Sequence, residues 1–117
     1  MDLQSNIDIA PELSLDYSPY ENNIAGGYTH TVVRYFDGHL EAFGSDTEGE
    51  VSGTPVGEDF VQVAAGGNFS LALKNDNTIM SWGLISGVPN DNDIVQIDAS
   101  ENYGMALKSD GHILTFG

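Results

Sequence analysis

The chain has 117 residues, of which 40% are hydrophobic, 18 are acidic, 3 are lysine or arginine and none is cysteine. The absence of cysteine excludes disulfide and thiolate chemistry. The formal net charge of −15 argues against direct binding to DNA or RNA, because proteins contact phosphate mainly through lysine and arginine. Neither a membrane-spanning run of roughly 18 apolar residues nor a signal-peptide pattern occurs, so we expect a soluble protein and assign it no compartment.

Residues 1–23 lie outside the pattern that organises the rest of the chain. Ile7 and Ile9 alternate with polar residues, and Leu13 and Leu15 continue the same parity. This alternation is typical of short strands. Two interpretations stay open: a frayed terminus, or an N-terminal leader that docks as an arm on a neighbouring repeat or subunit.

From residue 24 onward, one sequence unit occurs three times. The copies are AGGYTHTVVRYFDGHLEAFG at 25–44, AGGNFSLALKNDNTIMSWG at 65–83 and ASENYGMALKSDGHILTFG at 99–117. We align Ala25, Ala65 and Ala99, and the first copy then needs one inserted residue, Tyr35 or Phe36. The copies begin 40 and then 34 residues apart, and periods in this range indicate solenoids, propellers or arrays.

Each copy is predicted to form a β-hairpin. In the second copy, Phe69, Leu71 and Leu73 alternate with small or polar residues, which is the period of a half-buried strand. The Asp-Gly pairs at 37–38 and 110–111 predict type I′ turns, in which both central residues have positive φ. Asn77 stands where the other copies have glycine, and asparagine tolerates the same left-handed geometry.

A further strand precedes the second and third hairpins, FVQVAA at 60–65 and IVQIDA at 94–99. With an outer strand in the connector, which we place at Glu50–Ser52, each unit becomes a four-stranded sheet. The predicted fold is therefore all-β, with three propeller repeats over residues 24–117. Their cores are 24–44, 60–83 and 94–117, joined by connectors at 45–59 and 84–93.

The connector at 45–59 is the leading candidate for a partner-binding surface. It is rich in glycine and carries five acidic residues, Asp46, Glu48, Glu50, Glu58 and Asp59. A loop of this charge suits a protein partner with a basic surface, although acidic residues also serve solubility.

The three basic residues, Arg34, Lys74 and Lys108, share one repeat position under this alignment, at the strand end before each turn. Either they mark a common face of the repeats, or each pairs with nearby carboxylates such as the turn aspartates. An exposed pair of this kind is worth about 0.2–1 kcal/mol.

No set of residues indicates a catalytic site, a cofactor or a metal, and we predict a non-enzyme because catalysis needs a convergent group of side chains. His39 and His112 share one repeat position and should lie far apart, and His30 stands alone on its strand. The Gly-Gly pairs at 26–27 and 66–67 lack the Lys-Ser/Thr of a phosphate-binding loop, and we interpret them as places where strands crowd. The run NDND at 90–93 lacks the glycine and terminal glutamate of a calcium-binding EF-hand loop, which favours a solvated turn.

The repeated pattern resembles the repeat of the regulator of chromosome condensation family, a group that includes the type II β-lactamase inhibitory protein. The matching residues are Val61–Gly67, Leu71–Lys74, Asp76 and Trp82-Gly83, and the first copy adds Gly44-Ser45-Asp46 with Gly49-Glu50. The resemblance covers about residues 23–117. It implies a seven-bladed β-propeller with four-stranded blades, and members that act by protein binding: nucleotide exchange on a small GTPase, chromatin docking or enzyme inhibition.

Three repeats depart from this pattern, because closed propellers typically need about 4–8 blades. Either the sequence is a fragment of a longer propeller, or copies self-associate, most simply as a dimer that closes a six- or seven-bladed ring. We predict a non-enzymatic protein-binding module that presents acidic propeller loops to a protein partner, as a small inhibitor would. Two alternatives stay open: a phage-encoded inhibitor that mimics nucleic acid, and a structural subunit of a virion, appendage or other assembly.

Overall fold

The computed structural model describes residues 23–117, so the predicted leader at 1–23 lies almost entirely outside the described residues. Within them the chain forms nine β-strands and no helix. The strands are β1 (Ile24–Gly26), β2 (His30–Arg34), β3 (Leu40–Gly44), β4 (Phe60–Ala65), β5 (Phe69–Lys74), β6 (Ile79–Gly83), β7 (Ile94–Ala99), β8 (Gly104–Lys108) and β9 (Ile113–Phe116).

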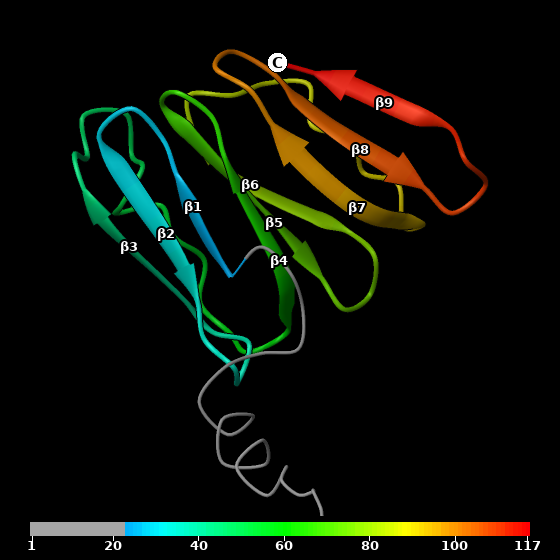
Figure 1. The fold of residues 1–117 in the computed structure, drawn as a ribbon, viewed down its shortest axis with the longest axis horizontal. Helices are drawn as coiled ribbons and strands as arrows, with labels where there is room; N and C mark the ends of the chain where they lie inside the picture. Colours follow the sequence, from blue (N-terminus) through cyan, green and yellow to red (C-terminus); the bar gives the residue numbers. More distant parts are fainter. Residues whose placement is uncertain (1–22) are drawn as a thin grey trace, which may run out of the picture.

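The strands form three separate antiparallel sheets, each made of three consecutive strands, in the orders β1-β2-β3, β4-β5-β6 and β7-β8-β9. Figure 1 shows the sheets fanned one after another from left to right, in chain order. Each sheet corresponds to one copy of the repeated sequence. The prediction of an all-β fold made of consecutive propeller repeats is confirmed.

The predicted fourth strand of each unit is absent from the described residues. Glu50–Ser52 lies in turns, not in a strand. The Asp46 carboxylate accepts the N–H groups of Val51 and Ser52, each at 2.8 Å, so two backbone donors that a strand would need are bonded to a side chain. A side chain that satisfies nearby backbone groups in this way competes with strand pairing.

The three hairpin turns share one geometry, but it is not the predicted type I′. Of the two central residues in each predicted turn, only the second has positive φ: Gly38 at 90°, Asn77 at 70° and Gly111 at 92°. The Asn77 N–H bonds to the Lys74 carbonyl, and the Lys74 N–H bonds to the Thr78 carbonyl. This pattern indicates a type I turn followed by one left-handed residue, the common three-residue hairpin loop. Asn77 fills the left-handed position, as expected.

The strand register corrects the alignment of the first repeat. His30 lies opposite Gly44 in the first sheet, and Phe69 lies opposite Gly83 in the second. The first copy therefore aligns with the second at a constant offset of 39 residues, so the predicted insertion at position 35 or 36 is wrong. The second and third copies keep their offset of 34 residues.

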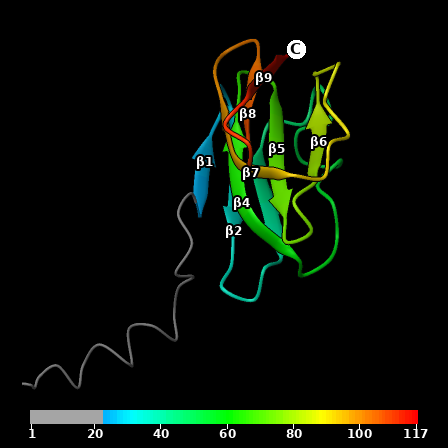
Figure 2. The ribbon, with the colours of Figure 1, turned by 90° about the vertical axis from the view of Figure 1, so that its right-hand side faces the viewer.

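The second sheet lies between the other two and is buried on both faces. Phe69, Leu71 and Leu73 of β5 pack in a cluster with the third sheet, whereas Ala72 of the same strand packs in a cluster with Val32 of the first. Alternate residues of a strand point to opposite faces, which explains why β5 is apolar or small at successive positions. Figure 2 looks along this row of sheets, with the third sheet nearest the viewer.

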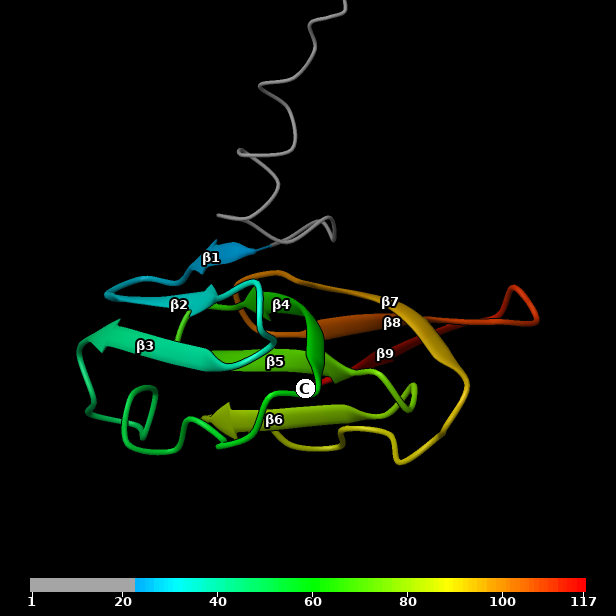
Figure 3. The same ribbon diagram turned by 90° about the horizontal axis from the view of Figure 1, so that it is seen from below.

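The first strands of the sheets, β1, β4 and β7, lie on the same side of the molecule, and the third strands lie on the opposite side (Figure 3). A chain of backbone hydrogen bonds links the loops that follow these first strands. The Tyr28 N–H donates to the Gly67 carbonyl at 3.0 Å, and the Gly67 N–H donates to the Glu101 carbonyl at 2.8 Å. These three residues hold one repeat position, so the bonds connect equivalent points of consecutive sheets.

Candidate functional site: a groove beside β3

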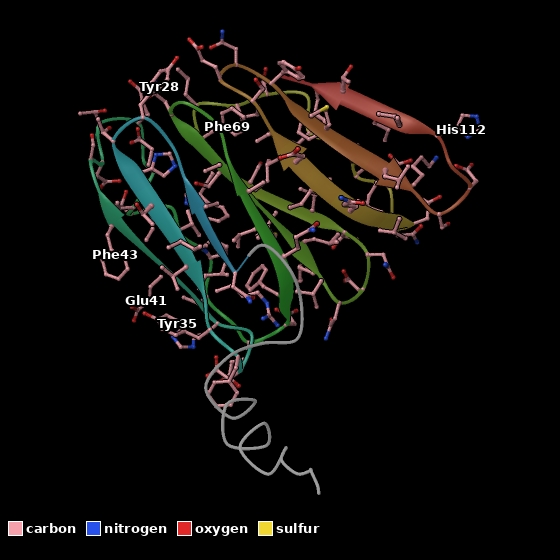
Figure 4. The ribbon with its side chains drawn as sticks, in the orientation of Figure 1. Tyr28, Tyr35, Glu41, Phe43, Phe69 and His112 are labelled. Atoms are coloured by element: carbon pink, nitrogen blue, oxygen red, sulfur yellow. The ribbon has the colours of Figure 1, made fainter. Side chains whose placement is uncertain are left out.

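A groove of about 440 Å³ runs between β3 and the connector at 45–59. One wall is His39 together with β3, the outermost strand of the first sheet, which pairs only with β2 among the described residues. The other wall includes Thr54–Gly57, where Val56 is almost fully exposed. Glu41 and Phe43 of β3 point away from the second sheet, at the left of Figure 4. The groove thus combines an unpaired strand edge with exposed apolar side chains.

The connector is anchored to the second sheet by Trp82. The Trp82 indole N–H donates to the Glu50 carbonyl at 2.8 Å, and the ring is buried. Gly53 lies against this ring, since a Cβ atom at Gly53 would lie 3.5 Å from the ring atom Cδ1 of Trp82. The connector is also folded on itself, because the Thr54 hydroxyl donates to the Val51 carbonyl at 2.7 Å. These contacts hold the outer wall of the groove in place.

The structure separates the five acidic residues predicted to bind a partner. Asp46, Glu48 and Glu58 are exposed, and Asp59 is partly exposed. Glu50 is 0% exposed, so it cannot touch a partner in this conformation. One Glu50 oxygen accepts the Glu48 N–H at 2.8 Å, and the other has no hydrogen-bond partner among the described residues. Glu50 is therefore a structural residue of the connector.

Asp46 accepts backbone hydrogen bonds within the connector. The N–H groups of Ser52 and Val51 bond to its carboxylate and lower its pKa from the ordinary value. Hydrogen bonds to the charged form of a carboxyl favour that form. Asp46 thus shapes the turn while its charge stays at the surface.

The three basic residues do not share one position. Arg34 lies opposite Leu40, as Leu73 lies opposite Ile79, so Arg34 is equivalent to Leu73 and not to Lys74. Its side chain is buried, and its Nε donates to the Phe60 carbonyl. The common basic face considered from the sequence is therefore not formed.

The two lysines pair with aspartates of the connectors instead of the turns. Lys74 lies 3.5 Å from Asp59. Lys108 lies 3.1 Å from Asp91 and 3.8 Å from Asp93. The hydrogen bond to Asp91 and the charge of Asp93 raise the Lys108 pKa. Both carboxylates in the run 90–93 thus face an ammonium group.

The turn aspartates Asp37, Asp76 and Asp110 each bond to the residue two places later. The Asp76 carboxylate accepts the backbone N–H and the hydroxyl of Thr78, at 3.1 and 2.6 Å. Asp37 and Asp110 accept the backbone N–H of a histidine, each at 3.0 Å. These bonds lower the pKa of all three aspartates.

The histidines form no common site. His39 stacks on Tyr35 with ring centroids 4.4 Å apart. Figure 4 shows Tyr35 and His112 at opposite ends of the molecule. His30 is buried between the first two sheets, where its Nε2 lies 2.9 Å from the Ser70 hydroxyl.

Over residues 23–117, no group of three or more His, Cys, Asp or Glu side chains is arranged to hold a metal ion. The same part of the chain contains no helix with the length and hydrophobicity to span a membrane.

Residues 60–84, which span β4, β5 and β6, match the family model described as the Regulator of chromosome condensation (RCC1) repeat. The matched segment includes Trp82 and the paired strands of the second sheet described above. No curated protein sequence matches the chain.

Three solved structures illustrate the fold. The CRINKLY WD40 ectodomain of the Arabidopsis thaliana receptor kinase ACR4 matches 80% of this chain with a TM-score of 0.69 and 18% identity. The ectodomain of the Physcomitrella patens receptor kinase CR4 matches 80% with a TM-score of 0.71 and 24% identity. Prp20p of Saccharomyces cerevisiae matches 84% with a TM-score of 0.64 and 22% identity.

The matched regions make up 37%, 28% and 32% of those three proteins, so this chain spans about a third of the length of its structural relatives. Residues 60–84 thus match an RCC1 repeat, and the described residues have the fold of part of a β-propeller similar to that of Prp20p. Because one propeller scaffold serves many activities, the likeness indicates the fold and leaves the partner open.

Proposed function

We propose that this protein is a protein-binding module whose groove beside β3 takes an extended, basic segment of a partner protein. The RCC1-like repeat fold suggests a protein-interaction module. Prp20p, a structural relative, binds Gsp1p and histones, which are protein partners. The observation that carries the proposal is the edge of β3, which is unpaired among residues 23–117, beside the apolar groove.

An extended peptide would add a fourth strand to the first sheet. Strand addition supplies main-chain hydrogen bonds, and alternate side chains of the peptide supply specificity. Pro55 and Val56 of the connector offer apolar contacts at the groove. Glu58 is exposed and directly follows Gly57, which lines the groove, so lysine or arginine at alternate peptide positions suits its charge.

The experiment uses a fluorescent eight-residue peptide that alternates valine and lysine, with binding followed by anisotropy. Val56→Lys places a positive charge at the groove and should weaken binding at least about tenfold, a loss of about 1.4 kcal/mol. Leu84→Lys makes the same charge change on the other connector, also at an exposed apolar residue, and should leave binding within about twofold, since surface changes away from a site cost little. Equal affinity in the two variants would refute the groove as the binding site.

A peptide of the same length that alternates valine and glutamate provides the charge control. The basic peptide should bind more weakly as salt rises from 50 to 500 mM, because exposed charges are screened over about 10 Å at 0.1 M salt. If the acidic peptide binds as well as the basic one, the partner's chemistry is not the one proposed here.

A further inference from the structure

The first and third sheets each have one face that no described residue covers. The free face of the first sheet carries Ile24, Thr31, Val33, Glu41 and Phe43. The free face of the third sheet carries Gln96, Asp98, Met105, Leu107 and Ile113. Both faces combine apolar residues with a single carboxylate.

The free face of the first sheet carries the residue types that, in the other two sheets, pack on the preceding sheet. At the repeat position of Ile24, the second and third sheets have Val63 and Ile97, each 1% exposed against the preceding sheet, whereas Ile24 is 69% exposed. At the position of Phe43 they have the buried Trp82 and Phe116. The face therefore keeps the residue types that pack on a preceding sheet.

The free face of the third sheet matches the opposite side of that contact. Leu71, Leu73 and Ile79 are among the residues with which the second sheet packs on the third, together with Ala64 and Phe69. The third sheet has Met105, Leu107 and Ile113 at the same repeat positions, and Ile113 is 67% exposed. One chain thus presents the two complementary sides of the contact that it already makes twice within itself.

Polar groups at the two ends continue the same pattern. The hydrogen-bond chain through Tyr28, Gly67 and Glu101 leaves the Glu101 N–H and the Tyr28 carbonyl without a backbone partner among the described residues. Between the second and third sheets, the Gln62 side chain accepts the Ile97 N–H at 2.8 Å. Gln96 holds the repeat position of Gln62 and is exposed on the free face of the third sheet.

We propose that a second copy of this chain covers both free faces. The third sheet of each copy packs on the first sheet of the other, and the two chains form a closed ring of six sheets. In this ring the Glu101 N–H donates to the Tyr28 carbonyl of the second copy, and Gln96 accepts the Ile24 N–H of the second copy. The arrangement is two-fold symmetric, because each residue pair occurs once at either junction, and six blades fall within the range of closed propellers, about 4–8.

The charge of the chain should make this contact depend on the salt concentration. Each copy has a formal charge of −15, and Glu41 and Asp98 stand on the free faces where Met80 and Ala64 stand in the second sheet. Like charges repel, and salt screens exposed charges over about 8 Å at 0.15 M. Association through these faces should therefore strengthen as salt rises, the opposite of the dependence expected for the basic peptide in the groove.

The first test is light scattering after size exclusion at micromolar concentration and 0.5 M salt. The expected mass is twice the 12.5 kDa of one chain. Ile24→Asp should return it to one chain, whereas Val56→Asp, an equal charge change on the connector, should leave the larger mass. A single-chain mass for the unmodified protein, or a ladder of species larger than a dimer, would overturn the proposal. Because the groove is tested separately with a peptide, either idea can fail alone.

The second test fixes the contact itself. A Cβ atom on Gly104 of the third sheet would lie 2.9 Å from Cδ1 of Leu71 in the second sheet. Thr31 holds the repeat position of Gly104, and Met105 holds that of Leu71. Across the proposed junction, Thr31 of one copy should therefore lie beside Met105 of the other. The chain has no cysteine, so the single variants Thr31→Cys and Met105→Cys, refolded together, should be joined by a short bismaleimide into a covalent dimer. Neither variant alone, nor Thr31→Cys with Val56→Cys, should be joined. Absence of a covalent dimer in the first mixture would overturn the proposed junction.

Discussion

Replacing Glu50 with glutamine should stabilise the protein. The Glu50 side chain is fully buried, and one of its oxygens has no hydrogen-bond partner among the described residues. Burying an ionised group costs several kcal/mol unless it is paired, whereas an unsatisfied neutral group costs about 1–3 kcal/mol. Glutamine keeps the oxygen that accepts the Glu48 N–H and exchanges the unpartnered oxygen for a neutral amide group.

The expected gain for Glu50→Gln is about 1–2 kcal/mol in the free energy of unfolding, the difference between those two penalties. For a domain of about 60–100 residues, each kcal/mol raises the midpoint of thermal unfolding by about 4–8 °C. Urea titration at one fixed protein concentration measures the change, because association would make the apparent stability depend on concentration.

Glu48→Gln is the matched control, because it removes the same charge from an exposed neighbour and should change stability by less than about 0.5 kcal/mol. If Glu50→Gln instead loses about 1 kcal/mol or more, a loss typical of a broken hydrogen bond, the second oxygen has a stabilising partner and the reasoning is wrong.

Three further predictions concern the loops. Gly66→Ala should cost about 1–3 kcal/mol by overpacking, because its Cβ would clash with the Phe69 ring and lie 2.6 Å from the Ser100 carbonyl oxygen. Gly26→Ala, with open space around it, should cost under about 1 kcal/mol; thermal unfolding compares the two. Asn77→Ala should cost about 2–3 kcal/mol, since it places alanine in a left-handed position and removes the 2.9 Å hydrogen bond to the Ile94 carbonyl. Equal stability of Asn77→Ala and Asn77→Gly would contradict this. The turn aspartates and Asp46 have lowered pKa values in the fold. The stability they supply is therefore present above pH about 4 and is lost as pH falls below it. A midpoint of thermal unfolding that rises as pH falls from about 5 to about 3 would contradict that sign.

The sequence was sufficient to predict the number of repeats and the all-β fold, because alternation and turn residues act locally. The alignment of the first repeat failed for an identifiable reason. The Ala-Gly-Gly of the first copy was matched to that of the second, but Tyr28 holds the position of Gly67, as their shared chain of hydrogen bonds shows. A constant offset of 39 residues already fits Asp37 with Asp76 and Gly44 with Gly83, so the sequence held the signal for the correct register.

The fates of the charged residues could not be read from the sequence. Glu50 is one of several acidic residues in a loop, and its burial follows from the way the connector folds against the second sheet, where the Trp82 indole bonds to its carbonyl. The sequence alignment grouped Arg34 with the lysines by charge. Its position on β2 instead directs its side chain into the interface between the first two sheets. Tertiary packing decides both cases, and local pattern carries no information about it. The groove beside β3 likewise depends on how the connector folds back.

Amide hydrogen exchange followed by NMR tests the central claim most directly, that three repeat sheets pack face to face with the second in the middle. At low salt, where the proposed ring is disfavoured, β5 is the central strand of the middle sheet and packs on both neighbours. Its amides at 69–74 should then exchange most slowly among residues 23–117, since protection is greatest in the best-packed strands. Slower exchange in β2 or β8 than in β5, or a β5 with protection no greater than that of the edge strand β3, would contradict this arrangement.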